Sequence, residues 1–375
     1  MIDSNVVNLD GPTGTIIEGN ALEVLGGMEA ESVDCLITDP PYGYSFMGKD
    51  WDRAVPDVAI WKECLRVLKP GSFAFIMSAP RLDVQSEMAR RIQEAGFNIA
   101  FTPLYWTYAT GFPKAQNMSK AVDKRLGVAP KEIRPASGVG FMKPDSEDWN
   151  VTKNPIIMPE PTTPQARALD GSYAGFQPKP AVEVIMVAMK PLSERTYVDQ
   201  ALANGKGVTW LDDCGIPTNE TVSNHSRSAE AAISKGKYGD SRAQETHQTA
   251  RQKEGRRFPA NLLVSDDVLG EYSRYFSLDK WAATLPFLVV PKASKSERNR
   301  GCEKNDHPTV KPLKLMAYLV TLGSRPGDVV LDPFVGSGTT CMAAKELGRQ
   351  YIGIEMNPEY AKIANARLEA TGVEA

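Results

Sequence analysis

Histidine and cysteine are scarce in this sequence, and long apolar runs are lacking. Its 375 residues include three histidines and five cysteines. The cysteines are odd in number, far apart and never paired as CxxC, so we expect neither a disulfide framework nor a zinc site, and no metal. The most apolar stretches, such as 73–77 and 184–189, have the length of strands and fall well short of the ~18 residues of a membrane helix.

A signal for secretion is also lacking. The first ten residues, MIDSNVVNLD, contain neither the basic region nor the apolar core that secretory signals carry. We therefore expect a cytoplasmic location and no membrane partner.

Charge of neither sign predominates. Lysine and arginine number 43 against 46 aspartates and glutamates, which leaves a formal net charge of −3. A nucleic-acid partner would therefore bind local basic patches. The polar segment 226–257 contains eight basic and four acidic residues. It fits such a patch, and its composition equally fits a solvated loop.

Both ends of the chain alternate short apolar runs with amphipathic helical patterns, which is typical of an α/β protein with a parallel sheet. In the first hundred residues we predict strands at 15–17, 33–38, 73–78 and 99–106, and helices at 57–68 and 83–95. In the last ninety we predict strands at 287–290, 329–331 and 351–354, and helices at 313–322, after Gly338 and from Pro358.

The middle of the chain differs from its ends. Residues 107–180 are rich in proline, glycine and lysine, which predicts long loops or an insert. A clear strand is expected at 182–188, whereas 215–257 has almost no large apolar residue from which to build a core. The length leaves one large domain with inserts and two domains both open.

The most specific motif is Thr38-Asp39-Pro40-Pro41-Tyr42-Gly43, directly after a predicted strand. Open α/β sheets place ligands at the carboxyl ends of their strands. The two prolines stiffen the turn and remove two backbone donors, so its carbonyls can only accept. With a carboxylate and an aromatic ring beside them, these acceptors suit a flat group that bears an NH2.

A second motif follows another predicted strand and opens a helix. It reads Leu331-Asp332-Pro333-Phe334-Val335-Gly336-Ser337-Gly338-Thr339-Thr340, and its glycines permit close approach of a ligand to the backbone. No lysine follows Gly338, so the turn fits a nucleoside better than a polyphosphate. Glu355 lies 19 residues after Gly336, near the spacing expected of an acid that binds ribose hydroxyls.

A third segment, His307-Pro308-Thr309-Val310-Lys311-Pro312, precedes the helix that leads into this turn. By itself it predicts a loop bounded by prolines, with a helix that starts near Pro312. His307, as an isolated histidine, is expected to be structural rather than a ligand or a base.

Together the three segments resemble the S-adenosylmethionine-dependent DNA amino-methyltransferases, and their order resembles the beta class. In that family the Asp-Pro-Pro-Tyr segment comes early and the glycine-rich segment late, with the target-recognition region between them. The resemblance covers about the first 110 and the last 90 residues, and segments 46–52, 111–114 and 292–294 are similar to phage and prophage members. It implies a circularly permuted Rossmann-like α/β methyltransferase fold with an inserted target-recognition region.

The resemblance also predicts how the chain is divided. Residues 1–110 would form the catalytic half of the methyltransferase domain, 285–375 the cofactor-binding half and 181–191 a core strand of the same domain. A loop-rich insert would occupy 111–180, and the target-recognition region 192–284.

The resemblance implies a catalytic role for Asp39, Pro40, Pro41 and Tyr42. An exocyclic amine is a poor nucleophile because its lone pair is delocalised into the ring. Hydrogen bonds to the Asp39 carboxylate and the Pro40 carbonyl would favour an amine whose lone pair points at the methyl group. Tyr42 would stack on a base flipped out of the duplex. Trp51, Trp106 and Phe112 are further candidates for this pocket, although such aromatics more often belong to the core.

The resemblance implies S-adenosyl-L-methionine as cofactor. Where the family usually has Gly-Asp near the first helix, this chain has Gly19-Asn20, whose amide oxygen can still accept from an adenine amino group. Lys311 offers a cation to the methionine carboxylate and Glu355 an acceptor to the ribose. The full set of predicted cofactor residues is Asn20, Thr309, Lys311, Asp332, Phe334, Gly336, Gly338, Thr339 and Glu355.

In the family, Asp at the first motif position favours adenine N6, whereas cytosine-N4 enzymes more often carry Ser. Asp39 therefore predicts a site-specific adenine-N6 methyltransferase of double-stranded DNA. Cytosine N4 is the close alternative, and an RNA methyltransferase or a catalytically inactive DNA-binding relative are weaker ones. Basic residues at 226–257, with Lys292, Lys295, Arg298 and Arg300, would neutralise phosphates. Beta-class relatives are often homodimers.

Overall fold

The computed structural model describes residues 14–43, 54–108, 115–128, 133–135, 157–176, 181–219, 255–285, 295–302, 305, 307 and 310–371. The chain divides into two compact units. The larger comprises the chain up to Ala109 and from Val182 onward, and the smaller comprises Thr110–Ala181.

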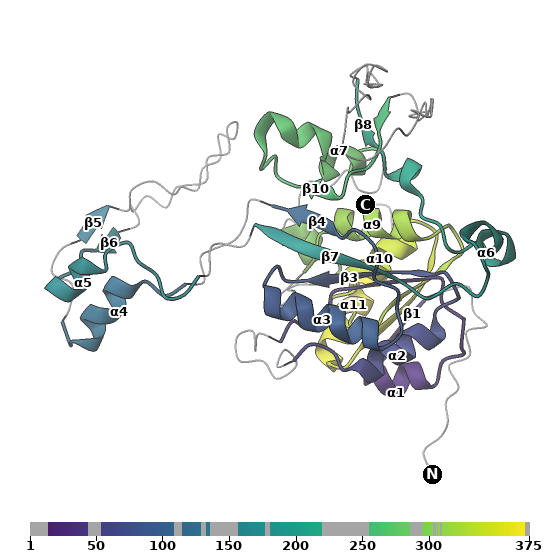
Figure 1. Ribbon diagram of the computed structural model, residues 1–375, viewed down its shortest axis with the longest axis horizontal. Coiled ribbons are helices and arrows are strands. Elements are labelled where there is room, and N and C mark those ends of the chain that lie inside the picture. Colours follow the sequence, from purple (N-terminus) through teal and green to yellow (C-terminus); the bar gives the residue numbers. More distant parts are fainter. Residues whose placement is uncertain are drawn as a thin grey trace, which may run out of the picture. The chain divides into compact units, whose positions relative to one another are not determined.

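The larger unit is built on an eight-stranded sheet with the order β1-β12-β11-β2-β3-β7-β4-β10 (Figure 1). Its strands are β1 (Thr15–Glu18), β2 (Cys35–Thr38), β3 (Phe73–Ser78), β4 (Leu104–Thr107), β7 (Val182–Met189), β10 (Leu262–Val264), β11 (Val329–Asp332) and β12 (Gln350–Glu355). The last two strands of the chain, β11 and β12, lie between the first two. Both chain ends therefore form one sheet, as the predicted circular permutation requires.

The strands alternate their buried side chains between two cores. In β2, Cys35 and Ile37 belong to one core and Leu36 to the other. In β3, Phe75 faces the first core and Ile76 the second. Because successive side chains of a strand point to opposite faces, both faces of the sheet are covered.

Helices from the two chain ends cover different faces of the sheet. One face carries α1 (Ala21–Gly26), α2 (Val58–Val67) and α3 (Leu82–Glu94), and the other carries α9 (Leu313–Gly323) and α10 (Thr339–Glu346) (Figure 1). The last helix, α11 (Pro358–Glu369), contributes Leu368 to the core of α9 and α10. Side chains cap these helices locally: the Oδ1 atom of Asn20 accepts from the Leu22 N–H at 2.9 Å, and Asn357 caps α11.

The predicted strands and helices at both ends are confirmed within a few residues, with two differences. The strand expected at 99–106 begins only at Leu104, after Pro103, which has no N–H for the ladder. The prediction of a parallel sheet is also wrong in part, because β7 runs antiparallel to both β3 and β4. Thr107 pairs with Val182, so the excursion through 110–181 returns the chain beside the end of β4, as a hairpin does. The strand expected at 287–290 lies outside the described residues.

The described parts of 192–284 belong to the larger unit rather than to a separate body. They contain α6 (Tyr197–Asn204), the short 3-10 helices η3 (Leu211–Cys214) and η5 (Gly270–Tyr275), α7 (Leu278–Ala282) and a ribbon of β8 (Ile216–Pro217) with β9 (Arg256–Arg257). β10 extends the sheet beside β4. The predicted target-recognition region is therefore partly continuous with the sheet.

The smaller unit contains α4 (Met118–Arg125), α5 (Pro164–Ala168) and an antiparallel pair of β5 (Ile133–Pro135) and β6 (Ile157–Pro159). Asp123, buried on α4, accepts from the backbone N–H groups of Thr162 and Thr163 at 2.7 and 3.1 Å. This segment, predicted as long loops or an insert, thus contains short helices and a strand pair where it is described. α8 (Lys295–Arg298) precedes α9 in the larger unit. Every helix in the described ranges is too short or too polar to span a lipid bilayer.

Candidate active site

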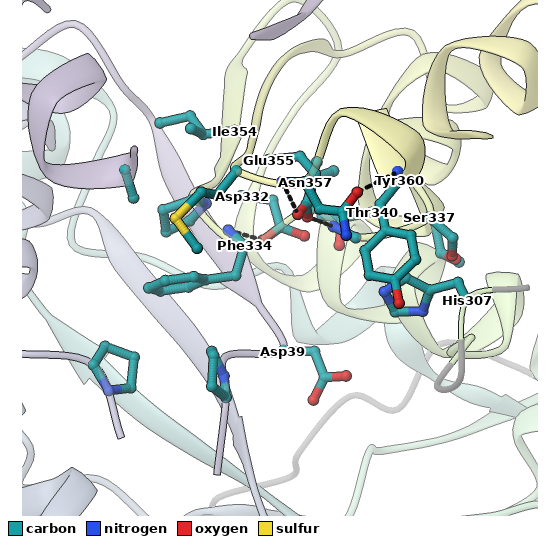
Figure 2. A pocket seen from close by; sticks show the side chains of 18 of the residues that line it. Asp39, His307, Asp332, Phe334, Ser337, Thr340, Ile354, Glu355, Asn357 and Tyr360 are labelled. Carbon is teal, nitrogen blue, oxygen red and sulfur yellow. Dashed lines mark hydrogen bonds between the residues drawn. The ribbon is translucent and has the colours of Figure 1, made fainter. Parts of the chain in front are cut away.

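A cavity of about 640 Å³ opens at the carboxyl ends of four neighbouring parallel strands. Its wall contains residues that directly follow β1, β2, β11 and β12, together with side chains of α2 and of the segment before α9 (Figure 2). This is the edge at which open α/β sheets bind ligands, and the volume is in the range of sites for molecules of nucleotide size. The two motifs predicted to meet here do so.

The turn after β2 presents Asp39 to this cavity. Asp39 and Pro41 line the wall, whereas Pro40 is buried and outside the lining. The Tyr42 hydroxyl donates to Asp39 Oδ1 at 2.5 Å. Burial, followed by the charge of Asp39, raises the pKa of Tyr42, so its hydroxyl stays protonated and can donate.

Lys311, which lies just before α9, faces two carboxylates. Its Nζ atom is 2.6 Å from Asp39 Oδ2 and 3.3 Å from Glu183 Oε2. The Lys311 side chain is 11% exposed. Burial alone lowers the pKa of Lys311, but the charges of Asp39 and Glu183 outweigh it and hold the pKa above its ordinary value. Lys311 is therefore a permanent cation at this site.

The turn after β11 approaches the cavity closely with its backbone. Gly336 and Gly338 adopt positive φ angles of 52° and 85°, which glycine accommodates without strain. A Cβ atom on Gly336 would lie 2.8 Å from His307 Nε2, so there is also no room for a larger residue. Phe334, Gly336 and Thr339 line the cavity, while Gly338 lies outside the lining and opens α10 as its N-cap.

Glu355, at the end of β12, fixes this turn. Its Oε2 atom accepts from the Gly336 N–H at 2.9 Å, and Oε1 accepts from the Asn357 N–H at 2.8 Å (Figure 2). Burial raises the pKa of Glu355, and the backbone N–H groups oppose that shift. Since a carboxylate has about four acceptor positions, Glu355 retains acceptor capacity for a ligand in the cavity.

Arg367, a residue of α11, also holds the glycine-rich turn. Its guanidinium is fully buried and donates to the Ser337 carbonyl at 2.5 Å, to Ser337 Oγ at 2.9 Å and to Thr339 Oγ1 at 3.1 Å. Burial lowers the pKa of Arg367 to about 10, so it still carries its charge at neutral pH. The glycine-rich turn is thus fixed from β12 and from α11.

Asp332, the last residue of β11, is 2% exposed. Its Oδ1 atom accepts from Thr38 Oγ1 at 2.7 Å and from the Phe334 N–H at 3.1 Å. Burial raises the pKa of Asp332 to about 6, which the hydrogen bonds from Thr340 and Thr38 oppose. These contacts connect the turn after β11 to the end of β2.

The remaining predicted residues are placed as follows. Asn20 lines the cavity, and its amide oxygen already caps α1. Thr309 lies outside the described residues, as do Trp51 and Phe112. Trp106 is a core residue, 7% exposed, whose Nε1 atom donates to Ser265 Oγ at 3.0 Å.

Some residues of the site were not among the predicted site residues. His307, expected to be structural, packs its ring edge-on against Tyr360 at 4.4 Å, and both residues line the cavity. Glu183 was missed because it lies in a strand far from any motif. The signal that could have found it is a single carboxylate within the apolar strand Val182–Met189.

The fold and the site define a class of protein: an α/β protein whose parallel strands end at one cavity, with an ion-paired carboxylate on one wall and a glycine-rich turn on another. Among the described residues, no group of three or more His, Cys, Asp or Glu side chains is arranged to hold a metal ion.

Comparison with known proteins assigns this class. The sequence profile of the N6_N4_Mtase family, described as DNA methylase, matches residues 33–366. The chain therefore belongs to this DNA methylase family, which confirms the family resemblance of its motifs.

Individual relatives match over shorter segments. The Type II methyltransferase M2.DpnII of Streptococcus pneumoniae is 55% identical over 92 residues, which is 24% of this chain and 30% of the relative. The Type II methyltransferase M2.LlaDCHI of Lactococcus lactis subsp. cremoris is 42% identical over 90 residues, again 24% of this chain and 29% of the relative. These matches thus span less than a third of either relative. Among solved structures, the cytosine-N4-specific PvuII DNA methyltransferase aligns over 96% of this chain and 88% of its own, with 17% identity and a TM-score of 0.47.

Proposed function

We propose that the protein transfers a methyl group from S-adenosyl-L-methionine to adenine N6 of a base flipped out of double-stranded DNA. One observation carries this proposal: the Asp39 turn and the glycine-rich turn line the same cavity. In the sequence Asp39 and Asp332 are 293 residues apart. A turn suited to an amine and a turn suited to a nucleoside are thereby brought together.

The cavity fits S-adenosylmethionine in size and chemistry. Its volume of about 640 Å³ is in the usual range for such ligands. The positive φ angle of Gly336 and the close approach of the His307 ring restrict this lining position to glycine, so the turn contributes backbone rather than a larger side chain to the cavity wall. Glu355 would bind the ribose hydroxyls, Phe334 and Asn20 the adenine, and Lys311 with Thr309 the methionine carboxylate. When bound, the cofactor supplies an electrophilic methyl group.

The chain's own residues would orient the target amine. Asp39 is half-buried, and each of its oxygens accepts from one side chain, Tyr42 on Oδ1 and Lys311 on Oδ2. Two acceptor positions remain, and one of them would accept an N–H of the amine. The Pro40 carbonyl would accept the other N–H, and the Tyr42 ring would stack on the base. Fixed acceptors of this kind favour the amine geometry in which the lone pair is free to attack.

Asp39 is the reason for proposing adenine as the target, because the resemblance links this residue to N6 rather than N4 methylation. Cytosine N4 is the second candidate, since the same two acceptors would also bind the cytosine amine. An RNA substrate has weaker support, because the related motifs that serve RNA carry Asn at this position.

The segment 192–284 is proposed to recognise the DNA sequence, with the basic stretch 226–257 at the phosphates. Most of that stretch lies outside the described residues. Its described end carries Arg256 and Arg257 on β9, and the Arg257 guanidinium lies 4.3 Å from the centre of the Tyr275 ring. Two partly exposed arginines on this ribbon suit phosphate contact. The domain boundaries at 110, 180, 191 and 284, and a homodimeric state, are part of this proposal.

The test is to identify the methylated nucleoside directly. Purified protein is incubated with unmethylated genomic DNA and labelled S-adenosylmethionine, the DNA is digested to nucleosides, and the products are identified by mass spectrometry. N6-methyladenine that disappears with the Asp39→Ala variant is the expected result. N4-methylcytosine would retain the chemistry and overturn the base, and no methylated nucleoside despite measurable cofactor binding would overturn DNA as the substrate.

A further inference from the structure

Glu183 is a charged residue in a place where charge is costly. The strand β7 reads Val-Glu-Val-Ile-Met-Val-Ala-Met, so Glu183 is its single ionisable residue. Its side chain is 19% exposed. A carboxylate withdrawn from water in this way destabilises a protein unless it is paired. The proposed function assigns no role to Glu183.

The contacts of Glu183 lead to the proposed catalytic turn. Its Oε2 atom is 3.3 Å from Lys311 Nζ, and the same Nζ atom is 2.6 Å from Asp39 Oδ2. Its Oε1 atom accepts from the Tyr108 hydroxyl at 3.4 Å. The three charged groups come from β7, from the segment before α9 and from the turn after β2, and they form one line of ion pairs.

We propose that Glu183 is a positioning residue for methyl transfer, which holds the Lys311 ammonium and through it the Asp39 carboxylate. The inference rests on the proposed function and adds a residue to it. Asp39 is held on one oxygen by Tyr42 and on the other by Lys311. Lys311 can keep Asp39 in place only if it has a second anchor, and Glu183 supplies that anchor from the rigid sheet.

This role is compatible with the role proposed for Lys311 toward the cofactor. An ammonium group has three N–H donors. One donates to Asp39 Oδ2, and Glu183 Oε2 pairs with the same ammonium by charge at 3.3 Å, which leaves at least a third donor for the methionine carboxylate. Loss of Glu183 should therefore affect the position of Asp39 while cofactor binding persists, because Lys311 retains its charge and its third donor.

The principal test replaces Glu183 with its uncharged isostere in the full-length protein. Glu183→Gln should lower kcat about 10- to 100-fold, the range expected when a reacting group is misplaced by about 1 Å. The dissociation constant for S-adenosylmethionine, measured by calorimetry, should change less than about twofold. A purely structural role would lower kcat and at the same time raise the dissociation constant or lower the melting temperature.

The chain offers a matched control. Asp328 has a similarly buried side chain, 21% exposed, and its Oδ2 atom pairs with Lys206 Nζ at 3.1 Å, away from the cavity lining. Asp328→Asn should leave kcat unchanged. An equal fall in kcat in both variants would overturn the proposal, because it would show that loss of any buried ion pair has this effect.

A double-mutant cycle tests whether Glu183 acts through Lys311. If it does, the double variant Glu183→Gln/Lys311→Gln should have a single-turnover rate within about twofold of that of Lys311→Gln alone. The reason is that substitutions of neighbours in one network do not have additive effects. Independent, multiplying effects would overturn the proposed route. If Glu183→Gln does not fold, Tyr108→Phe removes a donor to the same carboxylate, and an unchanged kcat in that variant would count against the proposal.

The positioning role of Glu183 and the proposed function can be overturned separately. Methyl transfer by the wild type with an unaffected Glu183→Gln variant would overturn the positioning role alone. A wild-type protein that binds cofactor but transfers no methyl group to DNA would overturn the proposed function and, with it, this role.

Discussion

Two aspartates lie at the carboxyl ends of neighbouring strands and are each followed by proline, yet their surroundings differ. Thr38-Asp39-Pro40-Pro41 ends β2, and Leu331-Asp332-Pro333-Phe334 ends β11. Asp39 pairs with the ammonium of Lys311, whereas Asp332 is almost fully buried and accepts from Thr38 and from the Phe334 N–H. Both residues line the cavity, but the Asp39 carboxylate is paired with a cation there, whereas the Asp332 carboxylate is used in hydrogen bonds within the turn and to the end of β2.

The difference lies in what each carboxylate can still do. Asp39 is held by Tyr42 of its own turn and by Lys311 of the segment before α9, and it retains acceptor positions on the cavity side. Asp332 joins two strands through its hydrogen bonds, and its burial favours the protonated form. We therefore assign chemistry to Asp39 and support of the site to Asp332, an assignment that substitutions can test.

The largest effect is expected from Asp39→Asn. The substitution retains the shape of the side chain but replaces one acceptor with a donor and removes the negative charge beside Lys311. The loss of one preorganised group of this kind typically costs about 100- to 1,000-fold in kcat. Rate measurements should show this fall while calorimetry shows little change in cofactor affinity. A large loss of affinity with an unchanged kcat would instead place Asp39 at the cofactor.

A smaller effect, on binding rather than rate, is expected from Glu355→Gln. Both carboxylate oxygens accept from backbone N–H groups, and the amide of glutamine presents a donor to one of them. Hydrogen bonds to a charged group are worth about 1.5–3 kcal/mol, so the dissociation constant for S-adenosylmethionine should rise about 10- to 100-fold. Calorimetry measures this directly. An unchanged affinity would show that the Gly336 turn holds its shape without Glu355.

The smallest effect concerns the pH dependence of stability. The pKa of Asp332 is about 6 in the folded protein, above the ordinary value of 3.8, so its contribution to stability is fully present below about pH 4 and is lost as the pH rises through 6. Between pH 5 and pH 8 the free energy of unfolding of the wild type should therefore fall by about 1 kcal/mol more than that of Asp332→Asn. Urea unfolding at both pH values measures this difference. Equal falls in the two proteins would mean that Asp332 stays ionised throughout.

Much of the fold was predictable because its signals are local. Strands at both chain ends follow from short apolar runs, and the caps at Asn20 and Asn357 follow from side chains that bind N–H groups two or three residues on. The direction of β7 was not predictable in this way. It depends on where the chain returns after residues 110–181, which no pattern within the strand records.

In the candidate site, too, some features were predictable from local sequence and others were not. The two turns were predicted from residue type and spacing, since Asp-Pro-Pro and Gly-Ser-Gly restrict the backbone whatever surrounds them. The partners of Lys311 were not predicted. Its predicted ligand was a methionine carboxylate, whereas the folded chain presents it with Asp39 and Glu183.

The sequence by itself determined the local elements of this protein: which segments become strands, which turns follow them and which family the turns belong to. The tertiary structure alone decided that β11 and β12 lie between β1 and β2, and that Lys311 meets Asp39 across 272 residues of chain. The physical reason is range. Backbone preferences and caps act between residues a few positions apart, whereas ion pairs and burial depend on which distant surfaces pack together, and only the folded chain brings those surfaces into contact.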